Sequence, residues 1–171
     1  MKLNRLNRRS RLHESEYTER PKNKDELVKI IRVTTRKEGD NCDLNFIDVS
    51  RIKDMSYLFS DKCGLNFFNG DISEWDVSNV EDMSGMFMYS DFNQDISKWN
   101  VSKVKNMEGM FLYSHFNQDI SDWDISNIKN TKDMLTGTKI KDEYKPQLKT
   151  NESRSLTESR NRISSNLRRF I

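Results

Sequence analysis

"DISEWDVSNVEDMSGMF" occupies residues 71–87, and it returns in similar form twice further along the chain. The second copy is "DISKWNVSKVKNMEGMF" at residues 95–111, and the third is "DISDWDISNIKNTKDML" at residues 119–135. A more divergent copy, "DLNFIDVSRIKDMSYLF", comes first, at residues 43–59. A fixed period is typical of stacked repeats, in which a single copy cannot bury its own apolar face. The sequence therefore predicts four stacked repeats over residues 43–135.

Each copy follows the apolar pattern LxxLxLxxV, which matches the first half of a leucine-rich repeat. Trp75 and Val77 are two residues apart, so both would lie on one face of a short strand. Met83, Met86 and Phe87 follow at spacings of three and four, which indicates a helical or 3₁₀ turn. The predicted fold class is an α/β repeat: a short leucine-rich-repeat-like solenoid of about four coils, each with one strand and one helical turn.

The sequence contains two sets of possible metal ligands, a column of aspartates and two cysteines. Asp71, Asp95 and Asp119 open three of the copies, and we expect them to accept backbone N–H bonds in turns. Calcium binding is not expected, because the glycine-rich frame of calcium-binding repeats is missing. Cys42 and Cys63 lack metal-ligand spacing and are expected to be buried thiols, with a disulfide left open. No metal or cofactor is predicted.

The strings "NCDLNFIDVSRIKDMSYLF", "FNGDISEWDVSNVEDMSGMF" and "FNQDISKWNVSKVKNMEGMF" resemble the BspA-like repeats of bacterial surface lipoproteins and virus-encoded proteins. The resemblance covers about residues 22–147. It implies a leucine-rich-repeat-like solenoid, often used for adhesion or protein binding. Residues 1–17 lack the apolar run of an export signal, and no stretch approaches the roughly 20 apolar residues of a membrane span. The expected location is therefore cytoplasmic or particle-associated, with the cell surface left open.

Composition and charge divide the chain into five predicted parts. A capping helix is expected at about Lys24 to Lys37, with Gly39 after its end. The parts are a basic arm at 1–21, the capping helix and entry at 22–42, the solenoid at 43–135, a cap and linker at 136–154, and a basic amphipathic helix at 155–171. Residues 1–22 carry a net charge of +4 and residues 151–171 a net charge of +3, so basic arms flank an acidic body.

The arms are predicted to dock the protein onto a larger assembly, although solvated tails are an equal alternative. The candidate docking residues are Arg5, Arg8, Arg9, Arg11, Leu156, Ile163, Leu167, Arg168, Arg169 and Phe170. Clustered arginines also allow non-specific binding to nucleic-acid phosphates.

A second candidate surface is the strand face opposite the core, where side-chain alternation would display three columns of polar residues. The predicted protein-binding residues are Glu74, Asp76, Ser78, Lys98, Asn100, Ser102, Asp122, Asp124 and Ser126. In repeat proteins of this type the equivalent face is often the binding surface. The alternative is a solvated sheet without a partner.

No catalytic motif is present in the sequence, and we do not expect an enzyme. His115 occupies a turn position that Asp91 fills in the preceding copy, which indicates a solvent-facing side chain. The predicted function is a non-enzymatic protein–protein interaction or structural module, such as a virion or capsid component docked by its arms. Its partners would be the proteins of that assembly, without membrane insertion. The alternatives are surface adhesion of the BspA-like type and nucleic-acid association through the arms.

Overall fold

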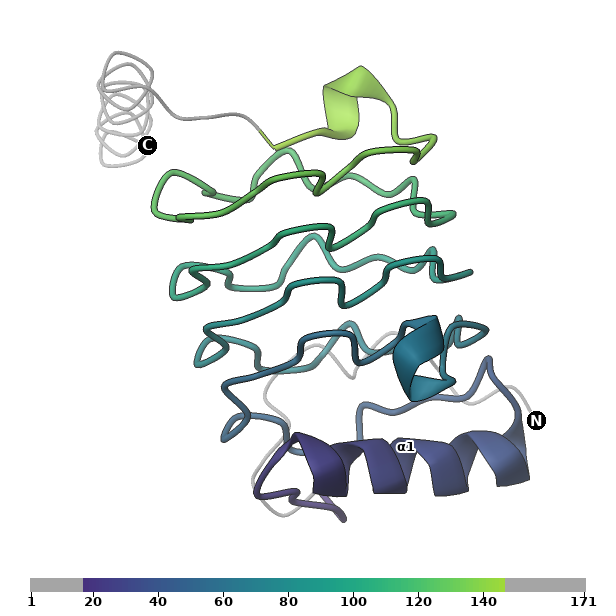
Figure 1. Ribbon diagram of the computed structural model, residues 1–171. Coiled ribbons are helices and arrows are strands. Elements are labelled where there is room, and N and C mark those ends of the chain that lie inside the picture. Colours follow the sequence, from purple (N-terminus) through teal and green to yellow (C-terminus); the bar gives the residue numbers. More distant parts are fainter. Residues whose placement is uncertain (1–16, 147–171) are drawn as a thin grey trace, which may run out of the picture.

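The computed structural model describes residues 17–146. Within this range a single α-helix, α1 (Lys24–Glu38), is followed by loops that lie one above another in a regular stack (Figure 1). Two 3₁₀ turns, η1 (Asp61–Cys63) and η2 (Asp142–Tyr144), are the other helical elements of these residues. Isolated parallel β-bridges, rather than β-strands, join successive loops. The four repeats therefore stack, but they do so as turns.

The predicted solenoid of strand-plus-helical-turn coils is wrong. Residues 17–146 contain one α-helix, no sheet, and only isolated bridges such as Asp54 with Asp82 and Asp82 with Asn106. Neither the segment of Trp75 and Val77 nor the one from Met83 to Phe87 forms the element that its spacing predicts. The chain instead turns several times within each repeat.

The cause is a three-residue motif in which Asp or Asn is followed by an inward residue and then by a residue that bonds back to the first side chain. Ser73 donates its N–H to Asp71 Oδ1 at 2.9 Å, and Ser78 donates to Asp76 Oδ1 at 3.0 Å. Such Asx turns fold the backbone back and interrupt an extended strand. The same bond occurs three times in each of the four repeats, with the acceptors Asp43, Asp48, Asp54, Asp71, Asp76, Asp82, Asp95, Asn100, Asn106, Asp119, Asp124 and Asn130.

After the third Asx turn of each of the first three repeats, alternate residues donate backbone hydrogen bonds to the next loop. The bonds between the second and third repeats run from Met83 to Asn106, Gly85 to Glu108, Phe87 to Met110 and Tyr89 to Leu112, at 2.8–2.9 Å. Met86 instead donates to Met83, three residues back, at 3.2 Å. Gly85 has a φ of +57°, a left-handed conformation that a right-handed helix cannot contain. We call this set of bonds between loops the ladder.

The core is a pair of phenylalanine columns. Phe59, Phe87 and Phe111 stack with ring centroids 5.5 Å apart and nearly parallel planes. Phe68, Phe92 and Phe116 form the second column at 6.3–6.4 Å, and all six rings are fully buried. Burial of each ring contributes on the order of 1.5–3 kcal/mol. The interior therefore stabilises the stack through side-chain packing, where a continuous sheet is absent from residues 17–146.

The predicted capping helix is confirmed as α1, which begins after the N-cap Asn23 and ends at Gly39. Leu27 and Ile31 on its inner face are fully buried against the first loop. Ahead of the helix, the Thr18 N–H donates to Phe46 O at 3.2 Å. The end of the predicted basic arm is thus part of the folded body.

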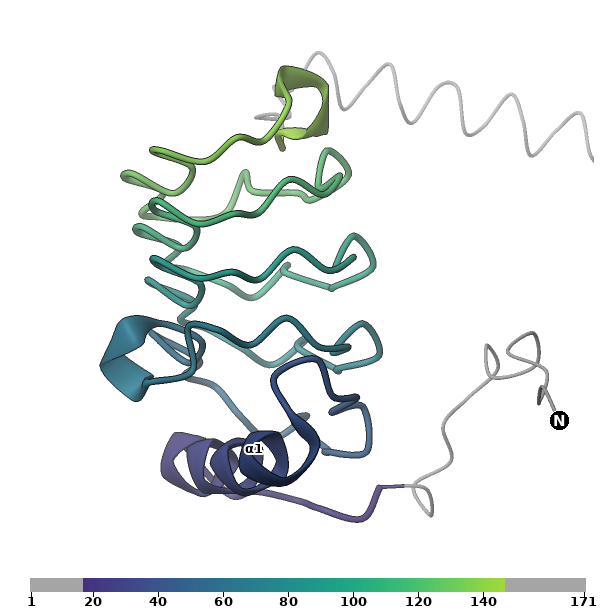
Figure 2. The ribbon, with the colours of Figure 1, turned by 90° about the vertical axis from the view of Figure 1, so that its right-hand side faces the viewer.

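At the opposite end of the stack, the described residues cover one side of the last loop. The Ile120 N–H donates to Tyr144 O at 3.0 Å, and the Lys141 N–H donates to Asn117 Oδ1 at 3.1 Å. Figure 2 shows η2 above the last loop, at the end of the stack remote from α1. The predicted linker beyond Pro146 and the predicted helix at 155–171 lie outside the described residues.

Candidate functional site

Many of the polar residues predicted to bind a partner form turns in the structure. Asp76 and Asn100 accept the N–H groups of Ser78 and Ser102, at 3.0 and 3.1 Å. Asp124 does the same for Ser126 at 3.1 Å. In these six residues, the side chains of Asp76, Asn100 and Asp124 and the backbone N–H groups of the three serines form the turns of the repeat. Of the nine predicted residues, the three that take no part in these turns are Glu74, Lys98 and Asp122, which are exposed.

These exposed residues border two shallow depressions of about 240 and 250 Å³. The first is lined by Asp71, Ser73, Glu74, Gln94, Asp95 and Lys98, and the second by Asp95, Ser97, Gln118, Asp119 and Asp122. The backbone N–H of Ser97 lowers the pKa of Asp95, and that of Ser121 lowers the pKa of Asp119. Both are the turn acceptors that we expected. Within residues 17–146, no group of three or more His, Cys, Asp or Glu side chains is placed to hold a metal ion.

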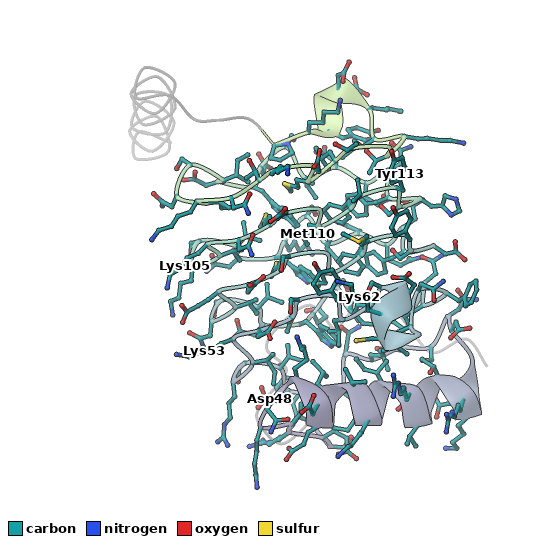
Figure 3. The ribbon with its side chains drawn as sticks, viewed as in Figure 1. Asp48, Lys53, Lys62, Lys105, Met110 and Tyr113 are labelled. Carbon is teal, nitrogen blue, oxygen red and sulfur yellow. The ribbon has the colours of Figure 1, made fainter. Side chains whose placement is uncertain are left out.

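Charged side chains alternate along one corner of the stack. Glu81 lies between Lys105, with which it forms a close ion pair, and Lys53, at 3.5 Å (Figure 3). The hydrogen bond and charge of Lys105, followed by those of Lys53, lower the pKa of Glu81. These three side chains carry a net charge of +1, because one carboxylate neutralises only one of the two ammonium groups.

Exposed aromatic side chains gather on the other edge of the ladder. Four large hydrophobic residues are exposed in the described chain, Val33, Phe67, Tyr89 and Tyr113, and the last two lie side by side on this edge. Tyr89 and Tyr113 are 51% and 56% exposed, and their rings stack with centroids 5.6 Å apart and an interplanar angle of 11°. Figure 3 shows Tyr113 at the opposite edge from Lys53 and Lys105.

A polar pair adjoins the aromatic rings. His115 Nδ1 lies 3.0 Å from Asp91 Oδ1, and both side chains are largely exposed, as expected for this turn position. The Asp91 N–H donates to Asn66 O at 2.8 Å, next to Phe67, whose side chain also lines a depression with Arg32 and Arg36 of α1. We call Phe67, Tyr89, Asp91, Tyr113 and His115 together the tyrosine edge.

The two tyrosines hold an unfavourable backbone conformation. Their φ angles are +53° for Tyr89 and +51° for Tyr113, and the corresponding residue of the last repeat is Gly137, with a φ of +75°. The left-handed region costs an L-residue roughly 1–2 kcal/mol and costs glycine almost nothing. Glycine would release this strain, although the Tyr113 ring also packs over Gly137, where an added Cβ would clash with Tyr113 Cδ1. Strain retained at an exposed site points to a functional role for the side chain.

Sequence reasoning missed this edge. The signal was the tyrosine in "MFMYS" and "MFLYS", which recurs 24 residues apart directly after the core phenylalanine and one further apolar residue. The predicted docking residues of the two arms, from Arg5 to Arg11 and from Leu156 to Phe170, lie outside the described residues.

The fold and this edge define a repeat protein with an exposed aromatic surface. A family model described as "Mycoplasma protein of unknown function, DUF285" matches residues 29–146, and the chain belongs to this family. The match includes all four repeats and the tyrosine edge. Neither a curated protein nor a solved structure matches the chain. Among residues 17–146, no helix has the length and apolar character needed to cross a bilayer.

Proposed function

We propose that this protein is a non-enzymatic interaction module that binds a protein partner through the tyrosine edge. The observation that carries the proposal is the pair Tyr89 and Tyr113, stacked, half-exposed and held in a conformation that favours glycine. Glycine, the residue at position 137, would release the backbone strain that both tyrosines retain. The retained rings are explained if a partner covers them.

The composition of the edge supports a protein as the partner. Tyrosine combines a large apolar ring with a hydroxyl and is enriched at the centres of protein interfaces. Met88 and Leu112, the residues before the two tyrosines, are partly exposed and extend the apolar area. Asp91 and His115 supply a polar rim, which excludes water from such a centre.

The resemblance to BspA-like repeats also supports a binding role, because that family is often used for adhesion or protein binding. The finer proposal is a component of a larger particle, cytoplasmic or particle-associated, to which the basic arms add affinity. Surface adhesion and phosphate binding by the arms are its alternatives. A gel shift of the full-length protein at low salt tests phosphate binding, which should weaken steeply as salt is added.

Site-specific photo-crosslinking of the full-length protein tests the proposal. A photoreactive amino acid replaces Phe67 on the tyrosine edge or, as a matched control, Val33 on α1; the two residues are 65% and 67% exposed. We expect a discrete crosslinked protein from position 67 and none from position 33. Identical products from both positions, or none from position 67, would contradict the proposed surface.

A further inference from the structure

The last loop ends the ladder with a row of backbone N–H groups that have no acceptor among residues 17–146. In the third repeat, four alternate N–H groups donate to carbonyl oxygens of the last loop at 2.8–2.9 Å. The bonds run from Met107 to Asn130, Gly109 to Lys132, Phe111 to Met134 and Tyr113 to Thr136. Their counterparts one repeat later are Thr131, Asp133, Leu135 and Gly137. These four donors form an open edge that continues the register of the ladder.

The other end of the stack is closed. Lys24 of α1 reaches the first loop, where its Nζ donates to Ser56 O at 3.2 Å and to Asp54 Oδ2 at 2.8 Å. The helix therefore covers the backbone that would accept bonds from a preceding loop. A second copy of the chain cannot place its first loop on the open edge, because its own α1 lies in the way (Figure 1).

Nor does the C-terminal cap close the edge. The η2 segment bonds to Ile120 and Asn117, which belong to the part of the last repeats that precedes the ladder segment. Gly137 and Thr131 are exposed to solvent. Asp133 is exposed as well, and Leu135 is partly exposed, so the described residues leave the row uncovered.

Unpaired lysines surround the open edge. Lys129, Lys132 and Lys139 are exposed and form no ion pair within the described chain. Asp133, the carboxylate in the row itself, accepts the hydroxyl of Thr136 at 3.1 Å. The side chains of residues 147–171 carry a net charge of +4 in the sequence. Charge complementarity favours an acidic segment.

We propose that the open edge binds an acidic extended segment of a partner protein as a further layer of the ladder. The segment would run parallel to residues 131–137 and present alternate carbonyl groups to the four N–H donors. Main-chain bonds of this kind provide affinity without a deep pocket, and alternate acidic side chains would lie near the lysines. This site does not depend on the tyrosine edge.

The test uses the full-length protein and two short fluorescent peptides, one of alternating Glu and Thr and one of alternating Lys and Thr. We expect fluorescence anisotropy to show binding of the acidic peptide only. The substitutions Lys132→Glu and Lys139→Glu together should weaken this binding about tenfold or more, because two attractive charges become repulsive. Tyr89→Gly with Tyr113→Gly should leave it unchanged, which separates this site from the proposed function.

Amide hydrogen exchange measured by NMR reports the bonds directly. In the free protein, the amides of Thr131, Asp133, Leu135 and Gly137 should exchange much faster than those of Met107, Gly109, Phe111 and Tyr113. The acidic peptide should slow the first set alone. Binding without this protection would mean surface charge attraction only, and protection in the free protein would mean that the chain covers its own edge. Either result, or no binding, overturns the proposal.

Discussion

Replacement of Asp76 by Val distinguishes a turn from a strand at the centre of the repeat. In a strand the change would be stabilising, because Val has a high and Asp a low β propensity on a scale that spans about 1 kcal/mol. In the structure, Asp76 Oδ1 accepts the Ser78 N–H at 3.0 Å, and loss of this bond costs about 1 kcal/mol. We therefore expect Asp76→Val to lower the free energy of unfolding by about 1 kcal/mol, or Tm by about 2–4 °C.

Asp76→Asn is the matched control, because Asn100 fills the same place in the next repeat and accepts the Ser102 N–H at 3.1 Å. It should unfold close to wild type. Urea denaturation followed by tryptophan fluorescence measures both variants, since Trp75 and its counterparts are buried in the core. A Val variant that is more stable than wild type would refute the turn-based account of the repeat.

Three further predictions concern the core, the turns and the cysteines. Phe87→Ala should lower the free energy of unfolding by roughly 3–5 kcal/mol in the same assay, because the ring is stacked on both sides; a loss below about 1 kcal/mol would contradict this packing. The pKa of Asp95 is lowered in the folded protein, so its carboxylate stabilises the fold above the unfolded pKa of about 4, and this stabilisation is lost as the pH falls through the folded pKa. A carboxyl titration by NMR that gives Asp95 an ordinary pKa would refute this prediction. Cys63 should react with a thiol reagent before Cys42, because burial raises the pKa of the Cys42 thiol. Mass spectrometry of the modified protein measures the order, and labelling of Cys42 first would contradict the prediction.

The repeats and most of the core could be predicted from the sequence, because a 24-residue period identifies equivalent positions without any knowledge of their conformation. Ile72, Trp75, Val77, Val80 and Phe87 are all buried as expected. The helix α1 was also predictable, since its caps and inner face are local features.

The conformation of each loop could not be predicted from the same pattern. An apolar residue between Asp and Ser, as at Val77, points inward both in a strand and in an Asx turn, so alternation does not separate the two. The spacing of Met83, Met86 and Phe87 suits a helix, but Gly85 has a positive φ and the N–H groups bond to the next loop. Bonds between repeats decide the conformation here.

The protein-binding face predicted from the sequence stays a prediction. Three of its residues, Asp76, Asn100 and Asp124, also accept backbone N–H bonds, a role that the alternation of side chains does not indicate. Tyr89 and Tyr113 are exposed at the edge of the ladder, where the backbone is left-handed. The 24-residue period shows that the two tyrosines are equivalent, but it does not indicate this backbone conformation.

The most direct test of the proposed function is crosslinking from position 67 in the protein with Tyr89→Gly and Tyr113→Gly, with Tm measured in parallel. Release of roughly 1–2 kcal/mol of strain per residue offsets a ring stack worth roughly 0.5–1.5 kcal/mol and the added flexibility of glycine. We predict that Tm stays within a few degrees of wild type while the crosslinked partner is lost. Crosslinking that persists at the wild-type level, or a variant that no longer folds, would contradict a binding role for the two tyrosines.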